Sequence, residues 1–393
     1  MNHPPNHIFE FTPETLGRWF EERQLPRYRA KQVLEWVYEK GVADPSLMTN
    51  LSKRERELLT REMTFLSCRI VRDVVASDGT RKLLVQWTDF APDAGTTPAA
   101  ETPAASLSLP QVGGDVLDQT RQTESVMIPT EDRRTACISS QVGCPVGCRF
   151  CASGLGGLDH NLSAGRIVEQ VWLLRKAMQT VAGEFPRITN VVFMGMGEPL
   201  ANLSAVVPAV RAICSLWGMA ISARKVTIST VGLPKAIERL SEQLDLPVTL
   251  ALSLHAPNDE VRRTLIPWAE YTTIAELLQA CRAWFEKTGR EITLEYTLLR
   301  GVNDRPEHAR QLAEIAKTLR ANINLIRYNE VAGLPFERPR DEDVRAFQEL
   351  LRAKQINTHI RASRGRDIAA ACGQLRHETG HKQRSRERSP AQQ

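Results

Sequence analysis

Three cysteines, Cys144, Cys148 and Cys151, lie within the stretch CPVGCRFC. The chain has eight cysteines in 393 residues, and four of them lie between positions 137 and 151, a spacing that does not resemble a disulfide framework. In a reducing compartment such a group indicates metal or redox chemistry. Three thiolates are one ligand short of a structural zinc site, whereas an iron–sulfur cluster held by three cysteines leaves one iron open. Because Cys137 or His160 can supply a fourth ligand, the spacing alone leaves both interpretations open.

Other polar residues follow apolar, β-branched runs in the second part of the chain. These runs predict strands at 135–140, 190–196, 225–230, 248–254, 292–299, 323–329 and 357–362. The polar motifs at their C-terminal ends are the cysteine loop, GMGEP (195–199), Ser229, SLHAP (253–257), Asn329 and SRGRDIAAACGQL (363–375). Since β/α proteins assemble active sites from loops at these strand ends, we expect the motifs to form one site.

Helical stretches alternate with the strands from residue 134 onward. Residues 163–178 show an apolar face at helical spacing after the capping residue Ser163. The same pattern predicts helices at 306–320 and 341–354. Strand–helix alternation predicts a parallel sheet covered by helices, either closed into a barrel or open.

The first 90 residues have a different organisation. Residues 10–62 predict short helices, the first with Thr12 as cap and Pro13 at its first position. Their interleaved basic and aromatic residues permit RNA contact, although an amphipathic bundle explains them as well. Residues 67–88 predict a hairpin around the Asp78–Gly79 turn, followed by a Pro- and Ala-rich linker.

The amino-acid composition limits the classes of protein to which the chain can belong. A hydrophobic share of 42% and a charged share of 25% are typical of a soluble globular protein, and nothing predicts a membrane span or a signal peptide, so we expect a cytoplasmic location. The net charge of +5 arises entirely from 361–393, which hold eight Lys or Arg against three Asp or Glu. The final stretch HKQRSRERSPAQQ predicts disorder, and a basic tail of this kind suits either RNA binding or simple solubilisation.

The motifs also resemble those of a known family. CxxxCxxC with Phe150 before its last cysteine is similar to the radical S-adenosylmethionine (SAM) superfamily. CISSQVGCPVGCRFCASG, NVVFMGMGEPLANL, VTISTVG, ALSLHAPND, LLRGVND and RGRDIAAACGQL together resemble the RlmN family of RNA adenine methyltransferases, and nearly as much its relative Cfr. The resemblance covers residues 124–377.

This resemblance implies a fold and its cofactors. The fold is a partial TIM-like (β/α) barrel of the radical SAM type. The implied domains are a helical RNA-binding domain (1–65), a hairpin with linker (66–123), the radical SAM core (124–377) and a basic tail (378–393). A [4Fe–4S] cluster would be held by the three cysteines of the loop, and SAM by Gly197, Glu198, Ser229, Ser253, Leu254, His255 and Asn329. Glu198 would receive the ammonium group of SAM, and the Ser and Asn side chains its ribose and carboxylate.

The resemblance also implies a reaction. One SAM would methylate Cys372, and a second would yield a radical that takes a hydrogen atom from this S-methylcysteine. The carbon radical then adds to adenine, Glu124 accepts the ring proton, and Cys137 releases the product through a transient disulfide with Cys372. Cys68, Cys214 and Cys281 match no motif and are expected to be ordinary thiols. His160 stands where the family usually has arginine.

The implied substrate is carbon 2 of adenosine in 23S rRNA, and in tRNA next to the anticodon. A Cfr-like enzyme acting on carbon 8 is the alternative within the class, and a zinc-stabilised, non-catalytic RNA-binding protein is the alternative outside it. A small electron-transfer protein is expected as the reductant, and the chain is expected to be a monomer.

Overall fold

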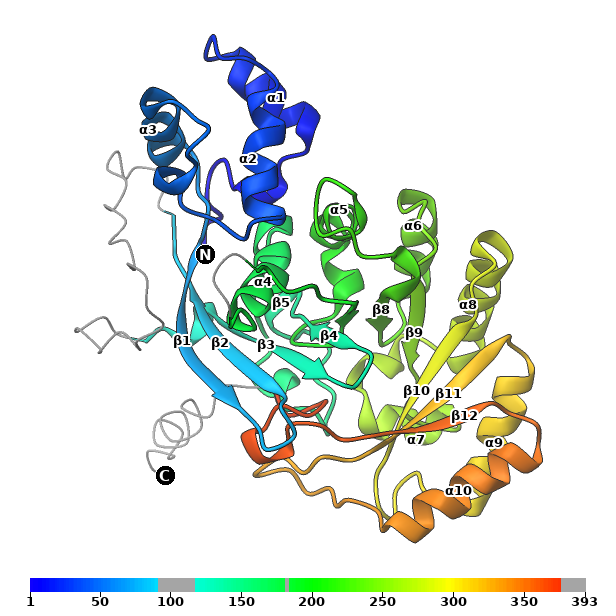
Figure 1. Cartoon of the computed structure of the whole chain (residues 1–393). Coiled ribbons are helices and arrows are strands. Elements are labelled where there is room, and N and C mark those ends of the chain that lie inside the picture. The colour runs from blue at the N-terminus through cyan, green and yellow to red at the C-terminus, as the bar shows by residue number, and fades with distance from the viewer. Residues whose placement is uncertain (91–116, 181–183, 376–393) are drawn as a thin grey trace, which may run out of the picture.

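The computed structural model describes residues 1–90, 117–180 and 184–375; most of the predicted linker and the whole basic tail (378–393) lie outside these residues. The described chain builds a ten-stranded sheet with the strand order β1-β2-β3-β4-β7-β8-β9-β10-β11-β12. Figure 1 shows this sheet curving around a concave face, with helices α4, α5, α6, α8, α9 and α10 on its outer side. Among the described residues its edges are β1 and β12, so the predicted partial barrel is confirmed.

The parallel part of the sheet contains the strands that the apolar runs predicted. They are β4 (Arg134–Cys137), β7 (Asn190–Phe193), β8 (Val226–Thr230), β9 (Thr249–Ser253), β10 (Ile292–Leu298), β11 (Ala321–Arg327) and β12 (Thr358–Arg361). Three antiparallel strands extend this sheet beyond β4. These are β1 (Cys68–Val75) and β2 (Arg81–Trp87), which form the predicted hairpin, and β3 (Gln122–Pro129), which pairs with both β2 and β4.

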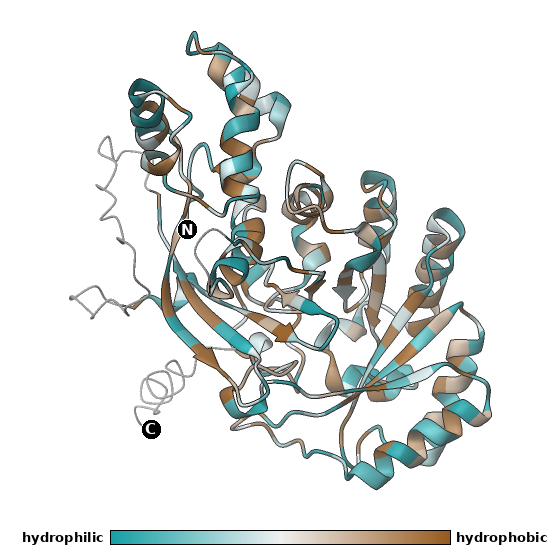
Figure 2. Cartoon of the chain, in the orientation of Figure 1, coloured by the Kyte–Doolittle hydropathy of each residue, from teal (hydrophilic) through white to brown (hydrophobic). Residues whose placement is uncertain are grey.

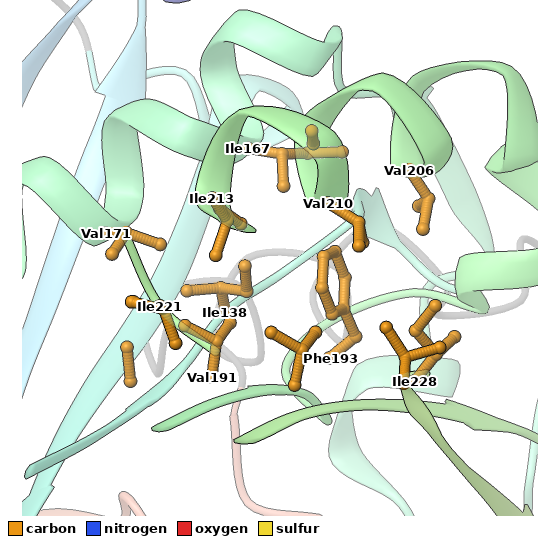
Figure 3. Close-up of a cluster of buried hydrophobic side chains, with 14 of the residues drawn as sticks. Ile138, Ile167, Val171, Val191, Phe193, Val206, Val210, Ile213, Ile221 and Ile228 are labelled. Carbon is orange, nitrogen blue, oxygen red and sulfur yellow. The ribbon is translucent and has the colours of Figure 1, made fainter. Parts of the chain in front are cut away.

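Helices cover the outer face because each presents an apolar side to the strands. They are α4 (Ala164–Ala177), α5 (Leu203–Cys214), α6 (Pro234–Gln243), α8 (Ile274–Thr288), α9 (Pro306–Lys317) and α10 (Asp341–Ala353). The short helix α7 (Asp259–Leu265) instead packs against the cysteine loop, where the Arg149 amide donates to the Leu265 carbonyl at 2.9 Å. The predicted cap is present, since the Ser163 side chain accepts a hydrogen bond from the Arg166 amide. Figure 3 shows Ile167 and Val210 of the helices meeting Phe193 and Ile228 of the strands, all fully or almost fully buried. Burial of this apolar layer is the main force that holds the helices on the sheet.

The first helices form a separate unit beside α4. They are α1 (Pro13–Glu21), α2 (Arg29–Tyr38) and α3 (Lys53–Glu62), and Thr12 caps α1 as predicted. Trp172 of α4 donates its indole hydrogen to the Val37 carbonyl (2.9 Å), and Figure 2 shows polar residues on much of the surface of these helices. No helix in the described ranges is long and apolar enough to cross a bilayer.

A fully buried carboxylate joins the N-terminal segment, the first strand and α4. Glu169 of α4 accepts hydrogen bonds from His7 Nε2 (2.9 Å), the Ser67 hydroxyl (2.6 Å) and the Ser67 amide (2.9 Å). The Cys68 thiol lies 3.2 Å from its other oxygen. Since none of these groups can turn to water, the carboxylate ties the accessory unit to the barrel.

We predict that Glu169→Ala lowers the free energy of unfolding by about 3 kcal/mol, because it leaves several buried donors without an acceptor. Denaturant unfolding measures this change. Glu57→Ala is the matched control, since Glu57 is 64% exposed and pairs with Lys53 on the surface of α3. Its effect should stay below about 0.5 kcal/mol. Equal effects of the two variants would contradict the assignment.

Candidate active site

One pocket opens at the C-terminal ends of the parallel strands. Its wall includes the three cysteines of the loop, residues from the ends of β7 to β12 and the segment around Cys372. Its chemically important lining residues are Cys144, Cys148, Phe150, Cys151, Gly197, Glu198, Ser229, Ser253, His255, Glu295, Thr297, Arg361, Cys372 and Gly373. The expectation that the polar motifs meet in one place is therefore confirmed for most of them.

The cysteine loop folds back on itself between the short strands β5 (Gln141–Gly143) and β6 (Leu158–Asn161). Gly143 has a φ of +75°, and a Cβ there would lie only 2.1 Å from the Gly157 carbonyl oxygen. The Cys144 amide donates to that same oxygen at 2.8 Å. Glycine is therefore required at 143, and the closed loop directs its thiols toward the pocket.

The three thiols lie in an environment that opposes their ionisation. Burial raises the pKa of Cys144 to about 12, and burial together with the two neighbouring thiols raises the pKa of Cys148 well above its usual value. The buried Arg262 guanidinium is the opposing influence, because it favours the Cys148 thiolate. Thiols enclosed in this way become thiolates only with strong added positive charge, which a bound metal supplies.

The possible fourth ligands Cys137 and His160 have other neighbours in the structure. Among the described residues, no three His, Cys, Asp or Glu side chains converge closely enough to hold one metal ion. His160, a possible fourth ligand by sequence, lies on β6 beside the amino group of Met1 (3.3 Å). Cys137 is packed on β4 against Val126 and Met196. Three cysteine thiolates suit an iron–sulfur cluster, which usually takes one thiolate per iron.

Glu198 offers a buried carboxylate in the same pocket as the cysteine loop. Its carboxylate accepts hydrogen bonds from the Leu200 amide (3.0 Å) and the Val231 amide (2.8 Å), and burial raises its pKa to about 6. Gly197 beside it has a φ of +104°, and a Cβ there would lie 2.7 Å from Gln141 Cβ. A cation such as an ammonium group would offset the burial of this carboxylate, so the site fits the group expected there.

Hydroxyl and backbone groups complete this side of the pocket. The Ser229 and Ser253 oxygens lie 3.1 Å apart at the ends of neighbouring strands. His255 accepts a hydrogen bond from the Thr297 amide at Nδ1 (3.0 Å), and burial followed by the charge of Arg262 lowers its pKa to about 3. It is thus neutral and fixed. The Leu254 side chain points into the main core, which leaves its backbone for any contact with a ligand.

Cys372 faces the pocket from a segment that is tied to the cysteine loop. The Asn329 amide group donates to the Cys372 carbonyl (3.2 Å), and the Ala152 amide donates to the Gly373 carbonyl (2.8 Å). Cys372 is exposed to solvent through the pocket although protein surrounds its sulfur, and this enclosure raises its pKa to about 11, with Arg361 as the opposing charge. Asn329, predicted as a SAM contact, therefore also positions Cys372.

Cys137 and Glu124 lie behind this segment. Cys137 on β4 packs with Ala370 and Leu375, which flank Cys372 in the chain. Burial, and then the charge of Cys372, raises the pKa of Cys137 to about 12. Glu124 is 2% exposed on the interior strand β3, so it differs from the exposed edge residue that its local sequence alone suggests.

Comparisons with known proteins give the family. Residues 138–313 match the model of the radical SAM superfamily, and residues 6–64 match the ribosomal RNA large subunit methyltransferase N-terminal domain. The dual-specificity RNA methyltransferase RlmN of Dichelobacter nodosus is 40% identical over 94% of this chain and 93% of its own length. The chain belongs to the RlmN family of radical SAM RNA methyltransferases.

Two further relatives match most of the chain. A probable dual-specificity RlmN of Gloeobacter violaceus is 42% identical over 92% of this chain and 93% of its own length. The crystal structure of a radical SAM methyltransferase from Sphaerobacter thermophilus superposes with a TM-score of 0.83 at 38% identity, covering 95% of this chain and 99% of that one.

Membership of the radical SAM superfamily implies a [4Fe–4S] cluster and SAM. The enclosed thiols and the buried Glu198 carboxylate fit these groups. In this RlmN-family chain the loop cysteines would hold the cluster, and Gly197, Glu198, Ser229, Ser253, Leu254, His255 and Asn329 would surround SAM, Leu254 through its backbone.

Two charged residues of the pocket were missed by the sequence analysis. Glu295 of β10 accepts hydrogen bonds from Arg361 Nη1 (3.2 Å) and Asn324 Nδ2 (2.9 Å). The attraction of Glu295 and of the thiols Cys372 and Cys137 outweighs desolvation and raises the pKa of Arg361. A signal existed, because a charged residue within an apolar strand such as ITLEYTLL is rarely buried without a partner.

We predict that Glu198→Gln weakens SAM binding about 10- to 100-fold above pH 6, because a charged hydrogen bond to the ammonium group is lost. In the unsubstituted protein, affinity should fall as the pH drops through about 6, since protonation of Glu198 removes its negative charge. Equilibrium binding to the anaerobically reconstituted protein measures both effects. A variant that kept the same pH dependence would contradict the role of Glu198.

Proposed function

We propose that this RlmN-family chain methylates carbon 2 of adenosine in 23S rRNA and in tRNA next to the anticodon. The single observation that carries the proposal is the tether that holds the Cys372 segment on the cysteine loop, with its thiol facing the same pocket. The match of residues 6–64 to the large-subunit rRNA methyltransferase domain supports the rRNA substrate, and the dual specificity named for the relatives supports a second RNA.

Carbon 2 of adenine is electron-poor and does not attack a methyl donor as an amine does, so a carrier is needed. When bound, the cluster supplies and takes back single electrons, and SAM supplies a methyl group and a 5′-deoxyadenosyl radical. Cys372 is the carrier, because a thiolate is the side chain suited to accept a methyl group by displacement. Arg361 lowers the free energy of its thiolate, since it is the cation that opposes the effect of burial.

The remaining two residues complete the transfer. Glu124 accepts the proton of carbon 2 as a general base. Once the ring has lost this proton and its unpaired electron, the Cys137 thiolate attacks Cys372 Sγ. The bond from that sulfur to the new carbon breaks, the electron pair stays with the carbon, and protonation leaves a methyl group and a disulfide. The packing of Cys137 beside residues 370 and 375 supports this pairing.

We further propose that the helical domain (1–65) contacts the RNA. It is followed by a connecting hairpin and linker (66–123), the catalytic core (124–377) and the basic tail (378–393). A small electron-transfer protein is the proposed reductant. The chain is proposed to act as a cytoplasmic monomer.

We predict that RNA from a strain lacking the gene loses 2-methyladenosine from both rRNA and tRNA. Mass spectrometry of RNA nucleosides measures this and separates 2-methyladenosine from 8-methyladenosine. Loss of 8-methyladenosine instead would assign the Cfr-like reaction, and unchanged levels of both nucleosides would contradict the proposed function.

We predict that Cys372→Ala abolishes RNA methylation while reductive cleavage of SAM continues, because the carrier is lost and the SAM contacts remain. Cys137→Ala should instead leave a covalent protein–RNA adduct that a denaturing gel detects. Cys214→Ala is the matched control, since this half-buried thiol at the end of α5 does not line the pocket. Normal methylation by Cys372→Ala would refute the carrier role.

A further inference from the structure

A buried lysine lies beside the proposed proton acceptor. Lys82 Nζ is 2.8 Å from Glu124 Oε1, and the two side chains are only 8% and 3% exposed. In the β2–β3 register Leu84 lies opposite Glu124 and Lys82 lies opposite Val126. Lys82 and Glu124 are therefore diagonal neighbours on one face of the sheet, the face on which Val126 packs against Ala370 and Leu375.

Lys82 also binds the segment that carries Cys372. Its ammonium group donates to the Ala369 carbonyl at 3.1 Å, three residues before Cys372. Ala369 has a φ of +49°, a left-handed conformation that is unfavourable for a residue with a side chain and so requires support from its surroundings. One ammonium group thus connects the carboxylate of β3 to the backbone beside the methyl carrier.

The hairpin turn holds the same segment at two further points. The Gly365 amide donates to Asp78 Oδ2 (3.1 Å), and the Ser77 amide donates to Asp367 Oδ2 (2.9 Å). Gly365 has a φ of +64°, and a Cβ there would lie 2.8 Å from the Thr80 side chain, so the two loops are in close contact. The β1–β2 hairpin is therefore part of the scaffold of the active site.

Because Glu124 is buried, the positive charge of Lys82 beside it affects whether its carboxyl group is ionised. A carboxylate taken out of water without compensating charge binds a proton, and a protonated carboxyl group cannot accept another. A lysine 2.8 Å away supplies that charge, and its second bond to Ala369 restricts where the pair can lie. Lys82 therefore contacts both the proposed base, Glu124, and the segment that carries Cys372.

We propose that Lys82 is a positioning residue that keeps Glu124 ionised and holds it toward the carbon 2 proton of an adenosine linked to Cys372. The inference rests on the proposed function. In the step concerned, the proton on carbon 2 moves to a Glu124 oxygen, the electron pair of the broken C–H bond stays in the ring, and the neutral carboxyl group remains hydrogen-bonded beside Lys82.

Lys82→Met tests this role, because methionine keeps most of the volume and removes the charge. We expect the release of methylated RNA to slow about 100-fold, the contribution typical of a general base, with RNA binding and SAM cleavage little changed. A covalent protein–RNA adduct should accumulate, and RNA deuterated at carbon 2 should slow its release further. Lys82→Arg should restore much of the rate, since it retains the charge.

Arg81→Met is the matched control. Arg81 directly precedes Lys82 in β2, and its side chain pairs with Asp73 of β1 and the Ala177 carbonyl, away from Glu124. It should release methylated RNA at the normal rate and form no adduct.

The wild-type enzyme, assayed alongside, separates the two ways of failing. If it forms 2-methyladenosine but Lys82→Met forms no adduct, the role of Lys82 is overturned and the proposed function stands. The role of Lys82 is overturned in the same way if RNA binding, SAM cleavage and product release fall together, because that pattern indicates a purely structural residue. If the wild-type enzyme forms no 2-methyladenosine, the proposed function fails and the role of Lys82 with it.

Discussion

The attachment of a C-terminal segment to a loop more than 200 residues earlier is the constraint on which this molecule depends. The Ser153 hydroxyl donates to the Leu375 carbonyl (2.7 Å), the Ala152 amide to the Gly373 carbonyl (2.8 Å), and Asn329 donates to the carbonyl of Cys372, which directly precedes Gly373. These short hydrogen bonds place one thiol on the wall of the pocket that three other thiols line. Without them, the cysteine loop and the proposed carrier would belong to separate parts of the fold.

The ionisable groups that line the pocket are enclosed by protein, which favours the neutral forms of its thiols and of its carboxylate Glu198. Enclosure raises the pKa values of the loop thiols, of Cys372 and of Glu198, so each gains from an added positive charge. The fixed cations Arg262, Arg361 and Lys82 lie behind the wall or within it, each bound to backbone or carboxylate oxygens. The buried thiols and the Glu198 carboxylate would thus be stabilised as anions by a bound metal cluster and by the positive charge of SAM.

The sequence was sufficient for features that depend on local pattern. Apolar, β-branched runs placed the parallel strands, Ser163 and Thr12 marked helix starts, and the Asp78–Gly79 turn marked the hairpin, because each depends on neighbouring residues. The burial of Glu124 and the contacts of Lys82 depend on pairing between strands separated by the linker, so no local pattern contains them. Glu295 and Arg361 likewise meet only when strands β10 to β12 assemble.

The role of Cys372 as the methyl carrier is the central claim, and mass spectrometry of the protein itself tests it most directly. Anaerobically reconstituted enzyme is incubated with methyl-labelled SAM in the absence of RNA, digested, and analysed for labelled cysteine. The account predicts one labelled methyl group on Cys372 and its transfer to RNA added afterwards. An unmodified Cys372 in enzyme that methylates RNA, or a label on another cysteine, would contradict it.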